Sequence, residues 1–375
     1  MISVLKEIEK FRQIGPMSID YTNNNRYRVV INENDGTKTA YYFSCPIYNL
    51  KTRKGIDLSF HKKEGAIYSV GSNGNITFSD CIRMDNSEGY ASVSLENNVS
   101  AISTNELVSG KDRICLTANG FMYKINCTNK KYFTFDLEVG KPFMEVRANN
   151  KCFSLMRERF KPFITLSCIG TAEENGNIIA PAKMDYQRIN DKTYNITVSP
   201  CAPVGKWILM EVNLYEPKLF QDTTVESMNP NSNNAFGSAA FIGNTSEYGE
   251  QWLYSRPDFN KLLELDGNKI IKTILHLPKH NSSDVEIQCF KVSARFCSFG
   301  SNWENKISAS NYVSGSYSKS HYQSINLTDL LTDKFGNLIR SDGFILRTKG
   351  KNNGFAAVAT ADSYYTPQIF EINFK

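Results

Sequence analysis

The feature that most constrains the fold of this chain is the regular return of tight-turn dipeptides between short strand-like runs. The segment "YRVVINENDGTKTAYYFS" places two β-rich runs around Asp35-Gly36, and similar runs flank Asn73-Gly74 and Asn119-Gly120. Asn, Asp and Gly accept the positive φ angles that two-residue hairpin loops require. Later runs such as "FITLSCIG" and "KWILMEVNLYEP" continue the pattern. The sequence therefore predicts an all-β protein built from antiparallel hairpins.

The length of the chain and the quality of its strand patterns bear on the number of domains. At 375 residues the chain is too long for one ordinary domain. Strand alternation is often incomplete, as expected where both faces of a sheet are partly covered, so we expect two or three β-sandwich, jelly-roll-like domains. The clearest boundary is at 215–224, where Pro217 ends a strand run. This predicts a β-rich region over 19–219, with a weaker division near 105–112, and a second sandwich over 220–375.

The first 18 residues carry the one credible helix. Apolar residues recur there at helical spacing, and Gly15-Pro16 stops the pattern; they are Val4, Leu5, Ile8, Phe11 and Ile14. Two interpretations stay open for residues 1–18. The helix packs on its own domain, or it docks on a neighbouring subunit of an assembly.

Charge and cysteine usage limit the partners and the compartment. The net charge of +5, from 43 basic and 38 acidic residues, is scattered, whereas a nucleic-acid surface normally carries a dense basic stripe. Nine widely spaced cysteines without a C-x-x-C motif favour buried free thiols and a reducing compartment. The N-terminus does not resemble a secretory signal, and no run is long enough for a membrane span. We expect no nucleic-acid partner, no membrane insertion, cytoplasmic synthesis, and action in a particle or at a cell surface.

Motifs for catalysis or metal binding are weak. The four histidines include one close pair, His276 and His280, but Pro278 between them argues against a shared helix face. We find no nucleophile, dinucleotide or phosphate-loop motif. We therefore assign no catalytic residue, no metal ligand and no cofactor, although a structural Ca²⁺ held by loop carboxylates and carbonyls is compatible with a sandwich module.

The C-terminal residues 221–375 resemble a known family. "DTTVESMNPNSNNAFGSAAFIGN" is similar to the opening of the disaggregatase-related (DNRLRE) domain, with an acidic residue leading a strand and a polar loop that ends in Asn-x-Phe-Gly. An arginine-led strand, an "A-x-L-x-L"-like strand, a tryptophan-acid loop, a short "D-x-T"-like segment and two closing strands follow in the family's order. The matching residues are Asp222, Asn234, Phe236, Gly237, Gly243, Arg256, Phe259, Ile274, Leu275, Leu277, Trp303 and Glu304.

The resemblance implies a non-catalytic β-sandwich similar to carbohydrate-binding modules, and it suggests glycan binding. Members of this family are attached to surface enzymes, wall-associated proteins and phage structural proteins. The pair Trp303 and Glu304 resembles the family's loop at one end of the sandwich, which favours a structural role for both residues over a ligand platform. No family is recognised for residues 1–220.

Aromatic residues in polar surroundings are the candidate glycan contacts. Aromatic faces stack on sugar C–H surfaces while neighbouring polar groups bond the hydroxyls. Two segments, "EYGEQWLYSRPDF" and "NYVSGSYSKSHYQS", supply them, and their Ser and Gly content is typical of adaptable binding surfaces. The alternative is that they are ordinary strand or core aromatics. The candidates are Trp252, Tyr254, Arg256, Tyr312, Tyr317, His321 and Tyr322.

These observations favour a non-catalytic protein that binds a surface polysaccharide and has protein partners in a larger particle, such as a phage tail or another exported assembly. One alternative is a purely structural assembly subunit without glycan binding. Another is a glycan-cleaving enzyme with its site in 20–215, whose carboxylates would come from loops and strand ends. Glu33, Asp35, Asp85, Glu88 and Glu304 are such carboxylates, although we interpret them as residues of solvated turns.

Overall fold

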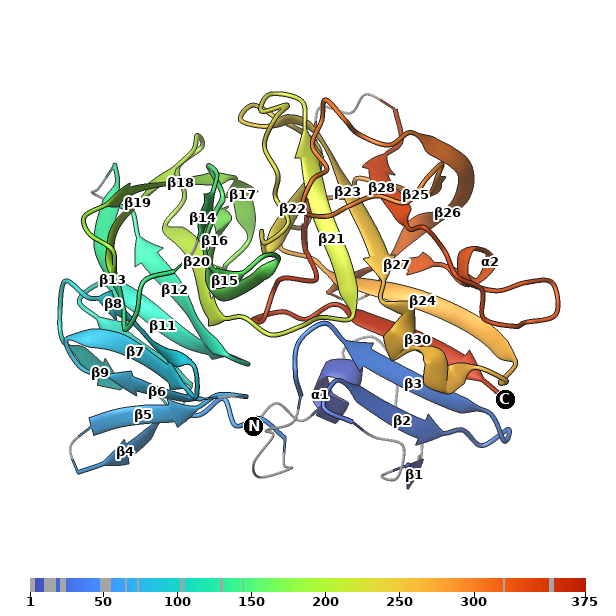
Figure 1. The fold of residues 1–375 in the computed structure, drawn as a ribbon, viewed down its shortest axis with the longest axis horizontal. Coiled ribbons are helices and arrows are strands. Elements are labelled where there is room, and N and C mark those ends of the chain that lie inside the picture. The colour runs from blue at the N-terminus through green and yellow to red at the C-terminus, as the bar shows by residue number, and fades with distance from the viewer. Residues whose placement is uncertain are drawn as a thin grey trace. The chain divides into compact units, whose positions relative to one another are not determined.

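A computed structural model shows that the protein is all-β (Figure 1). Strands make up 55% and helices 4%, and the described strands form three antiparallel sheets. This confirms the predicted fold class. The described residues are 4–9, 18–20, 25–47, 55–64, 66–72, 74–101, 103, 105–128, 131–143, 145–319, 321–350 and 354–375.

The described part of the chain divides into two compact units. Unit 1 contains Tyr48–Glu216 and Phe236–Ala239, and unit 2 contains Ser3–Ile47, Pro217–Ala235 and Ala240–Lys375. The division between Glu216 and Pro217 falls inside the segment 215–224 that the sequence singled out.

Unit 1 is a sandwich of two sheets. Among the described residues, one sheet has the order β14 (Glu145–Ala148), β15 (Cys152–Glu158), β16 (Lys161–Ala172), β20 (Trp207–Leu214), β12 (Gly120–Asn126), β11 (Asp112–Thr117), β10 (Glu106–Ser109) and β9 (Val99–Ala101), with β17 (Ile178–Ala180) beside β16. The other has the order β18 (Ala182–Arg188), β19 (Thr193–Pro200), β13 (Phe133–Val139), β8 (Gly89–Ser94), β7 (Cys81–Asn86), β6 (Asn75–Phe78), β5 (Ala66–Val70) and β4 (His61–Lys63).

The core of unit 1 lies between these sheets. Strand β13 alternates strictly, with every second residue buried. Its Leu137 shares one apolar cluster with Phe121 and Ile208 of the opposite sheet. Side chains from the two inner faces thus fill a common interior, as in other sandwiches.

The weaker division predicted near 105–112 is wrong. Strands β10 and β11 form a hairpin in one sheet, with Ser109 opposite Asp112. Gly110, at φ +60°, makes the turn between them. The polar residues that suggested a linker form this turn.

Unit 2 is a second sandwich, and one long strand joins its two halves. Among the described residues the order is β1 (Ser18–Ile19), β2 (Arg28–Asn32), β3 (Lys38–Phe43), β30 (Ile369–Phe374), β24 (Ile270–Pro278), β27 (Tyr322–Asn326), β26 (Ala309–Lys319), β25 (Ile287–Val292), β28 (Phe344–Thr348), β23 (Gly249–Pro257), β22 (Ala239–Thr245) and β29 (Phe355–Ala359), with β21 (Phe220–Glu226) beside β23. Strand β26 pairs with β27 in one half and, through register shifts, with β25 in the other. Leu275 and Phe370 of the first half share a buried cluster with Leu253 and Leu346 of the second.

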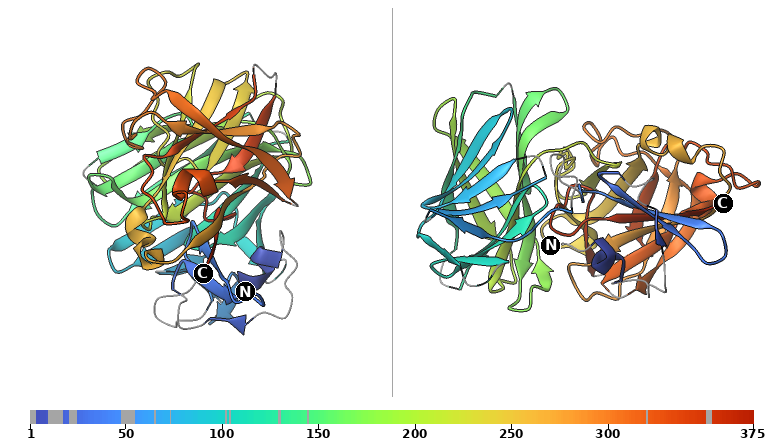
Figure 2. Two further views of the ribbon diagram at one scale, coloured as in Figure 1. Left: turned by 90° about the vertical axis from the view of Figure 1, so that its right-hand side faces the viewer. Right: turned by 90° about the horizontal axis from the view of Figure 1, so that it is seen from below.

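The first strands of the chain belong to unit 2, so the expected domain over 19–219 is wrong at its N-terminal end. Strand β3 pairs with β30 from Lys38 opposite Phe374 to Phe43 opposite Ile369. The blue hairpin therefore lies beside the strands of the C-terminal part (Figures 1 and 2). Pairing between strands this far apart in sequence leaves no mark on local periodicity, which is why the sequence assigned residues 19–47 to the wrong domain.

Short helices complete unit 2: α1 (Val4–Glu9), α2 (Thr328–Leu331) and the 3₁₀ turns η1 (Phe259–Lys261) and η2 (Leu263–Leu265). In α1, Ile8 is fully buried, and the Tyr322 hydroxyl donates a hydrogen bond to Glu7. These contacts favour packing of the helix on its own unit. Phe11 and Ile14 lie outside the described residues, and docking to another subunit stays a prediction.

The cysteines and helices bear on two further expectations. All nine cysteines are free thiols, and Cys297 is the one classed as exposed. None of the helices in the described ranges is long and apolar enough to cross a membrane.

Candidate functional site

One outward face of unit 2, formed by β23, β28, β25 and β26, carries a row of large side chains. Cross-strand pairing places Tyr254 opposite Ile345, Ile345 opposite Phe290, and Phe290 opposite Tyr312. Side chains that face each other across adjacent strands point to the same side of a sheet. Pairing therefore brings residues from four strands onto one surface.

Five side chains on this face form a continuous band, which we name the aromatic strip: Trp303, Trp252, Arg347, Phe290 and Tyr312. The ring centroids of Trp303 and Trp252 are 5.2 Å apart. The Arg347 guanidinium lies 5.4 Å from the Trp252 centroid and 4.2 Å from the Phe290 centroid. Phe290 and Tyr312 follow at 5.7 Å with their planes near perpendicular. In the strip, one cation, Arg347, thus lies between two pairs of aromatic rings.

The strip is accessible along its length and carries positive charge. Trp303, Trp252, Arg347 and Phe290 are partly exposed, and Tyr312 is 56% exposed. A second cation, the Lys306 ammonium, lies 4.1 Å from the Trp303 centroid. Cations at this distance are attracted to the π face of an aromatic ring. The strip can therefore offer stacking surfaces and hydrogen-bond donors to the same ligand.

The tryptophan end of the strip is held in place by the loop that follows β25. The backbone N–H groups of Trp303 and Glu304 both donate to the Pro230 carbonyl, at 2.9 and 3.2 Å. The Trp252 indole N–H donates to Glu250 at 2.8 Å. Both indoles pack against a small apolar cluster that includes buried Tyr254. Trp303 thus packs on this part of the sheet and contributes a ring to the strip, while the structural role expected for it stays a prediction.

The Tyr312 end depends on a glycine. Gly315 lies opposite Gln288 in the β25–β26 pairing. A Cβ atom at this position would lie 3.4 Å from the Tyr312 hydroxyl and 3.0 Å from a Glu286 carboxylate oxygen. The missing side chain leaves room for the tyrosine to lie over the strand.

Two of the seven predicted glycan contacts, Trp252 and Tyr312, lie in the strip. Tyr254 and Tyr322 are buried, so neither can stack on a ligand at this surface, and their assignment as contacts is wrong. The Tyr254 hydroxyl donates to the Ile307 carbonyl, and the Tyr322 hydroxyl donates to Glu7. Both tyrosines lie at strand positions among other side chains, which explains why they are buried.

The other three predicted contacts lie outside the strip. Arg256 is half-buried, donates to Gln221, and lies 5.9 Å from the Phe296 ring. Tyr317, 43% exposed, stands opposite Ser324 in the β26–β27 pair. His321 is exposed in the turn between these strands. Residues 311–319 lie in β26 and Tyr322 begins β27, so this segment belongs to a strand pair, and among its described tyrosines Tyr312 is the one that joins the strip.

Sequence reasoning missed three contributors: Phe290, Arg347 and Lys306. The alternation in β25, with Ile287 and Cys289 buried and Phe290 half-buried, marks Phe290 as outward-facing. Strand order was needed to join it to Arg347 on β28, because these strands are far apart in the sequence.

A buried histidine on β24 makes a three-residue network. His276 Nδ1 lies 2.8 Å from Ser324 Oγ, and its Nε2 lies 3.0 Å from Glu371. Burial lowers the pKa of His276, against the opposing effect of Glu371. His276 and Ser324 have no exposed surface. We assign the network to cross-strand bonding between β24 and its two neighbouring strands.

Three of the five carboxylates considered for glycoside hydrolysis bond to neighbouring side chains or backbone groups. Asp35 accepts hydrogen bonds from Thr37, which lower the pKa of Asp35. Asp85 binds the Arg83 guanidinium and Glu88 pairs with Arg157. In the described residues no group of three or more His, Cys, Asp or Glu side chains is placed to hold a metal ion. A structural Ca²⁺ stays a prediction.

No protein-family model matches the chain, and no curated protein matches its sequence.

Proposed function

We propose that the protein is a non-catalytic glycan-binding component of a larger particle, and that it binds a surface polysaccharide through the aromatic strip. The observation that carries the proposal is the uninterrupted series of ring and cation contacts from Trp303 to Tyr312. The DNRLRE resemblance of residues 221–375 supports it independently, because that family resembles carbohydrate-binding modules.

The chemistry of the strip suits a polysaccharide better than a small apolar ligand. A row of rings on an open sheet face can stack on the C–H faces of successive sugar units, and polar neighbours can bond their hydroxyls. Arg347 and Lys306 lie between or beside the rings, where they can donate to hydroxyl or carboxylate oxygens. Because the strip is accessible along its length, it can contact several successive units of a long chain.

Replacing Tyr312 by Ala is expected to weaken polysaccharide binding by the full-length protein about fivefold, because a lost stacking contact is worth about 1 kcal/mol. Arg347→Met is expected to have a similar effect. Affinity electrophoresis on a panel of bacterial surface polysaccharides measures both. Tyr132→Ala, which removes a 65% exposed tyrosine in unit 1, is the matched control and should bind as wild type.

The same series tests the location of the site. If Tyr317→Ala weakens binding while Tyr312→Ala does not, the site lies on the β26–β27 pair, and the strip is excluded. Failure of the wild-type protein to bind any polysaccharide would instead favour an assembly subunit without glycan binding.

Replacing Trp303 by Ala is expected to lower both stability and binding. The indole is partly buried against Trp252, so we expect a loss of about 2 kcal/mol in the free energy of unfolding, less than the 3–5 kcal/mol typical of a fully buried aromatic. Urea denaturation of Trp303→Ala beside Tyr312→Ala separates the two effects. Equal stability of the two variants would contradict the structural role of Trp303.

A further inference from the structure

A pocket of about 330 Å³ opens in unit 2, away from the residues of the aromatic strip. It is lined by residues of the β2 region, by Tyr42 of β3, and by Asn260, Lys261 and Glu264 of the two 3₁₀ turns. Its volume is at the lower end of the range for small-molecule sites. This size suits a single sugar ring.

Two lining residues of the pocket, Tyr42 and Glu264, belong to a polar network with Arg28. Arg28 forms an ion pair with Glu264 and donates to the Tyr42 hydroxyl at 3.3 Å. The Tyr42 hydroxyl in turn donates to Glu264 at 2.9 Å. Burial raises the pKa of Tyr42, which keeps this hydroxyl protonated. The Glu264 carboxylate is therefore neutralised by its own neighbours.

Three further lining residues, Arg26, Tyr27 and Lys261, place positive charge beside an aromatic ring. The Lys261 ammonium lies 5.5 Å and the Arg26 guanidinium 5.7 Å from the centroid of the Tyr27 ring. Lys261 donates to the backbone carbonyl of Lys218, a neutral acceptor. That bond uses one of the three donors of an ammonium group.

The position of Lys261 makes an anion favourable here. Lys261 is half-buried. Burial lowers its pKa, more than the nearby charge of Asp258 raises it. A partly desolvated ammonium is stabilised by an anion within bonding distance. An anionic ligand in the pocket would provide this partner.

We propose that this pocket binds the carboxylate of an acidic sugar residue, with Lys261 bonding the carboxylate and Tyr27 supporting the face of the sugar ring. Asn25 and Asn260 supply amide groups for the hydroxyls. The side-chain Oδ1 of Asn25 already accepts a hydrogen bond from the Tyr27 backbone N–H at 2.9 Å. The side-chain N–H₂ of Asn25 is therefore the group directed to the ligand. The contact between the sugar ring and Tyr27 distinguishes this ligand from a simple anion, which has no ring to stack.

The inference goes beyond the proposed polysaccharide site and does not depend on it. The strip and the pocket share no residue. A variant of the strip such as Tyr312→Ala should therefore leave binding in the pocket unchanged.

The test is a titration of the full-length protein with glucuronate, in which binding is measured by isothermal calorimetry or by ligand-observed NMR. We expect saturable binding with a Kd on the order of 1 mM. Glucose, the neutral counterpart, should bind at least tenfold more weakly. Lys261→Met, which keeps most of the aliphatic stem, should weaken glucuronate binding about tenfold and remove the preference over glucose.

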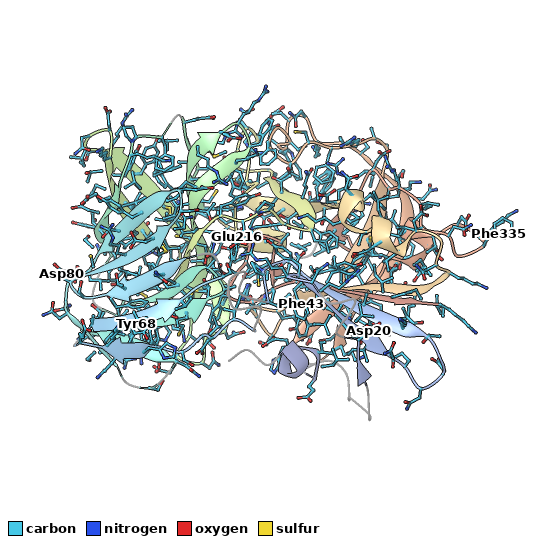
Figure 3. All side chains as sticks on the ribbon, turned by 60° about the horizontal axis from the view of Figure 1, so that its bottom comes forward. Asp20, Phe43, Tyr68, Asp80, Glu216 and Phe335 are labelled. Atoms are coloured by element: carbon cyan, nitrogen blue, oxygen red, sulfur yellow. The ribbon has the colours of Figure 1, made fainter. Side chains whose placement is uncertain are left out.

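Lys334→Met is the matched control, because it removes an ammonium 4.9 Å from the Phe335 ring in an exposed loop of the same unit (Figure 3). It changes the net charge equally and should bind glucuronate as wild type. Inorganic phosphate is the second probe, and binding as strong as that of glucuronate would overturn the sugar assignment. Absence of saturable glucuronate binding, or equal loss in Lys334→Met, would overturn the site itself.

Discussion

Deleting residues 1–47 is expected to unfold unit 2 while unit 1 stays folded. The deletion removes β3, which pairs with β30 along its whole length, and β2, which pairs with β3. It also removes the buried core side chains Val30, Ala40 and Tyr42. Fully burying one large apolar side chain contributes about 1.5–3 kcal/mol. The loss of these contacts and of the strand pairing is comparable to the whole stability of a domain, about 5–15 kcal/mol.

Differential scanning calorimetry of the full chain and of the 48–375 fragment measures this effect. We expect the fragment to lose the cooperative transition of unit 2. Adding a synthetic 18–47 peptide should restore it, because the peptide supplies the missing strands, whereas a scrambled peptide should not. A fragment that melts like the full chain would show that the N-terminal strands are dispensable.

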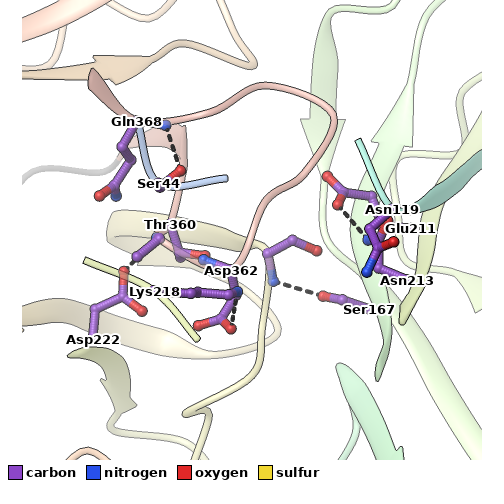
Figure 4. Close-up of polar contacts among 12 residues, drawn as sticks. Ser44, Asn119, Ser167, Glu211, Asn213, Lys218, Asp222, Thr360, Asp362 and Gln368 are labelled. Carbon is purple, nitrogen blue, oxygen red and sulfur yellow. Dashed lines mark hydrogen bonds and ion pairs between the residues drawn. The ribbon is translucent and has the colours of Figure 1, made fainter. Parts of the chain in front are cut away.

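Replacing Lys218 by Ala is expected to cost about 3–5 kcal/mol, because it leaves an uncompensated charge inside unit 2. Lys218 and Asp362 form an ion pair, and their side chains are only 6% and 8% exposed (Figure 4). The Lys218 ammonium also lies 4.7 Å from the Tyr364 centroid. Urea denaturation gives the free energy of unfolding. Lys261→Ala is the comparison and should cost less, because Lys261 is half-buried and donates to the neutral backbone carbonyl of Lys218.

The neighbouring Asp222 makes this cluster sensitive to pH. It accepts a hydrogen bond from the Ala361 N–H at 2.6 Å. Burial, and then the charge of Asp362, raise the pKa of Asp222 well above its usual value. Burial also raises the pKa of Asp362, while Lys218 opposes the rise. We infer that Asp222 holds the proton and Asp362 carries the charge that faces Lys218.

The sign of the pH effect follows from the raised pKa of Asp222. The folded state retains a proton that the unfolded state releases near pH 4. The stabilisation from this proton is complete below about pH 4 and is lost as the pH rises through the folded-state pKa. Asp222→Asn cannot titrate, so its stability relative to wild type should increase with pH from about 4 upward. A stability difference that does not change with pH, or a loss in Asp222→Asn as large as in Lys218→Ala, would contradict the proton assignment.

Much of the local structure could be predicted from the sequence. The Asp35-Gly36 turn connects β2 and β3, and Gly36 has the positive φ angle of +82° that the prediction requires. The runs "FITLSCIG" and "KWILMEVNLYEP" form strands β16 and β20, as predicted. Each of these features depends on residues close together in the chain, whose conformational preferences act locally.

The candidate site could be predicted only in part. Trp252 and Tyr312 were identified as aromatics in polar surroundings, but Tyr254, two positions after Trp252, is buried on the same face. The two residues differ in exposure because the loop that contains Trp303 and Ile307 covers Tyr254, whereas Trp252 lies at the edge of this loop. Alternation tells which face a side chain points to, and it cannot tell what covers that face.

The sequence by itself determined that this protein is all-β, that its strands join in hairpins, and where its largest division lies, because turn chemistry and alternation are properties of neighbouring residues. Only the tertiary structure decided that β3 completes the sheet of β30, that Trp252, Arg347 and Phe290 meet in one strip, and that Lys261 lies beside the Tyr27 ring in the lining of a pocket. These contacts join residues far apart in the chain. The pairing of strands and the packing of loops select them, and no short segment encodes either.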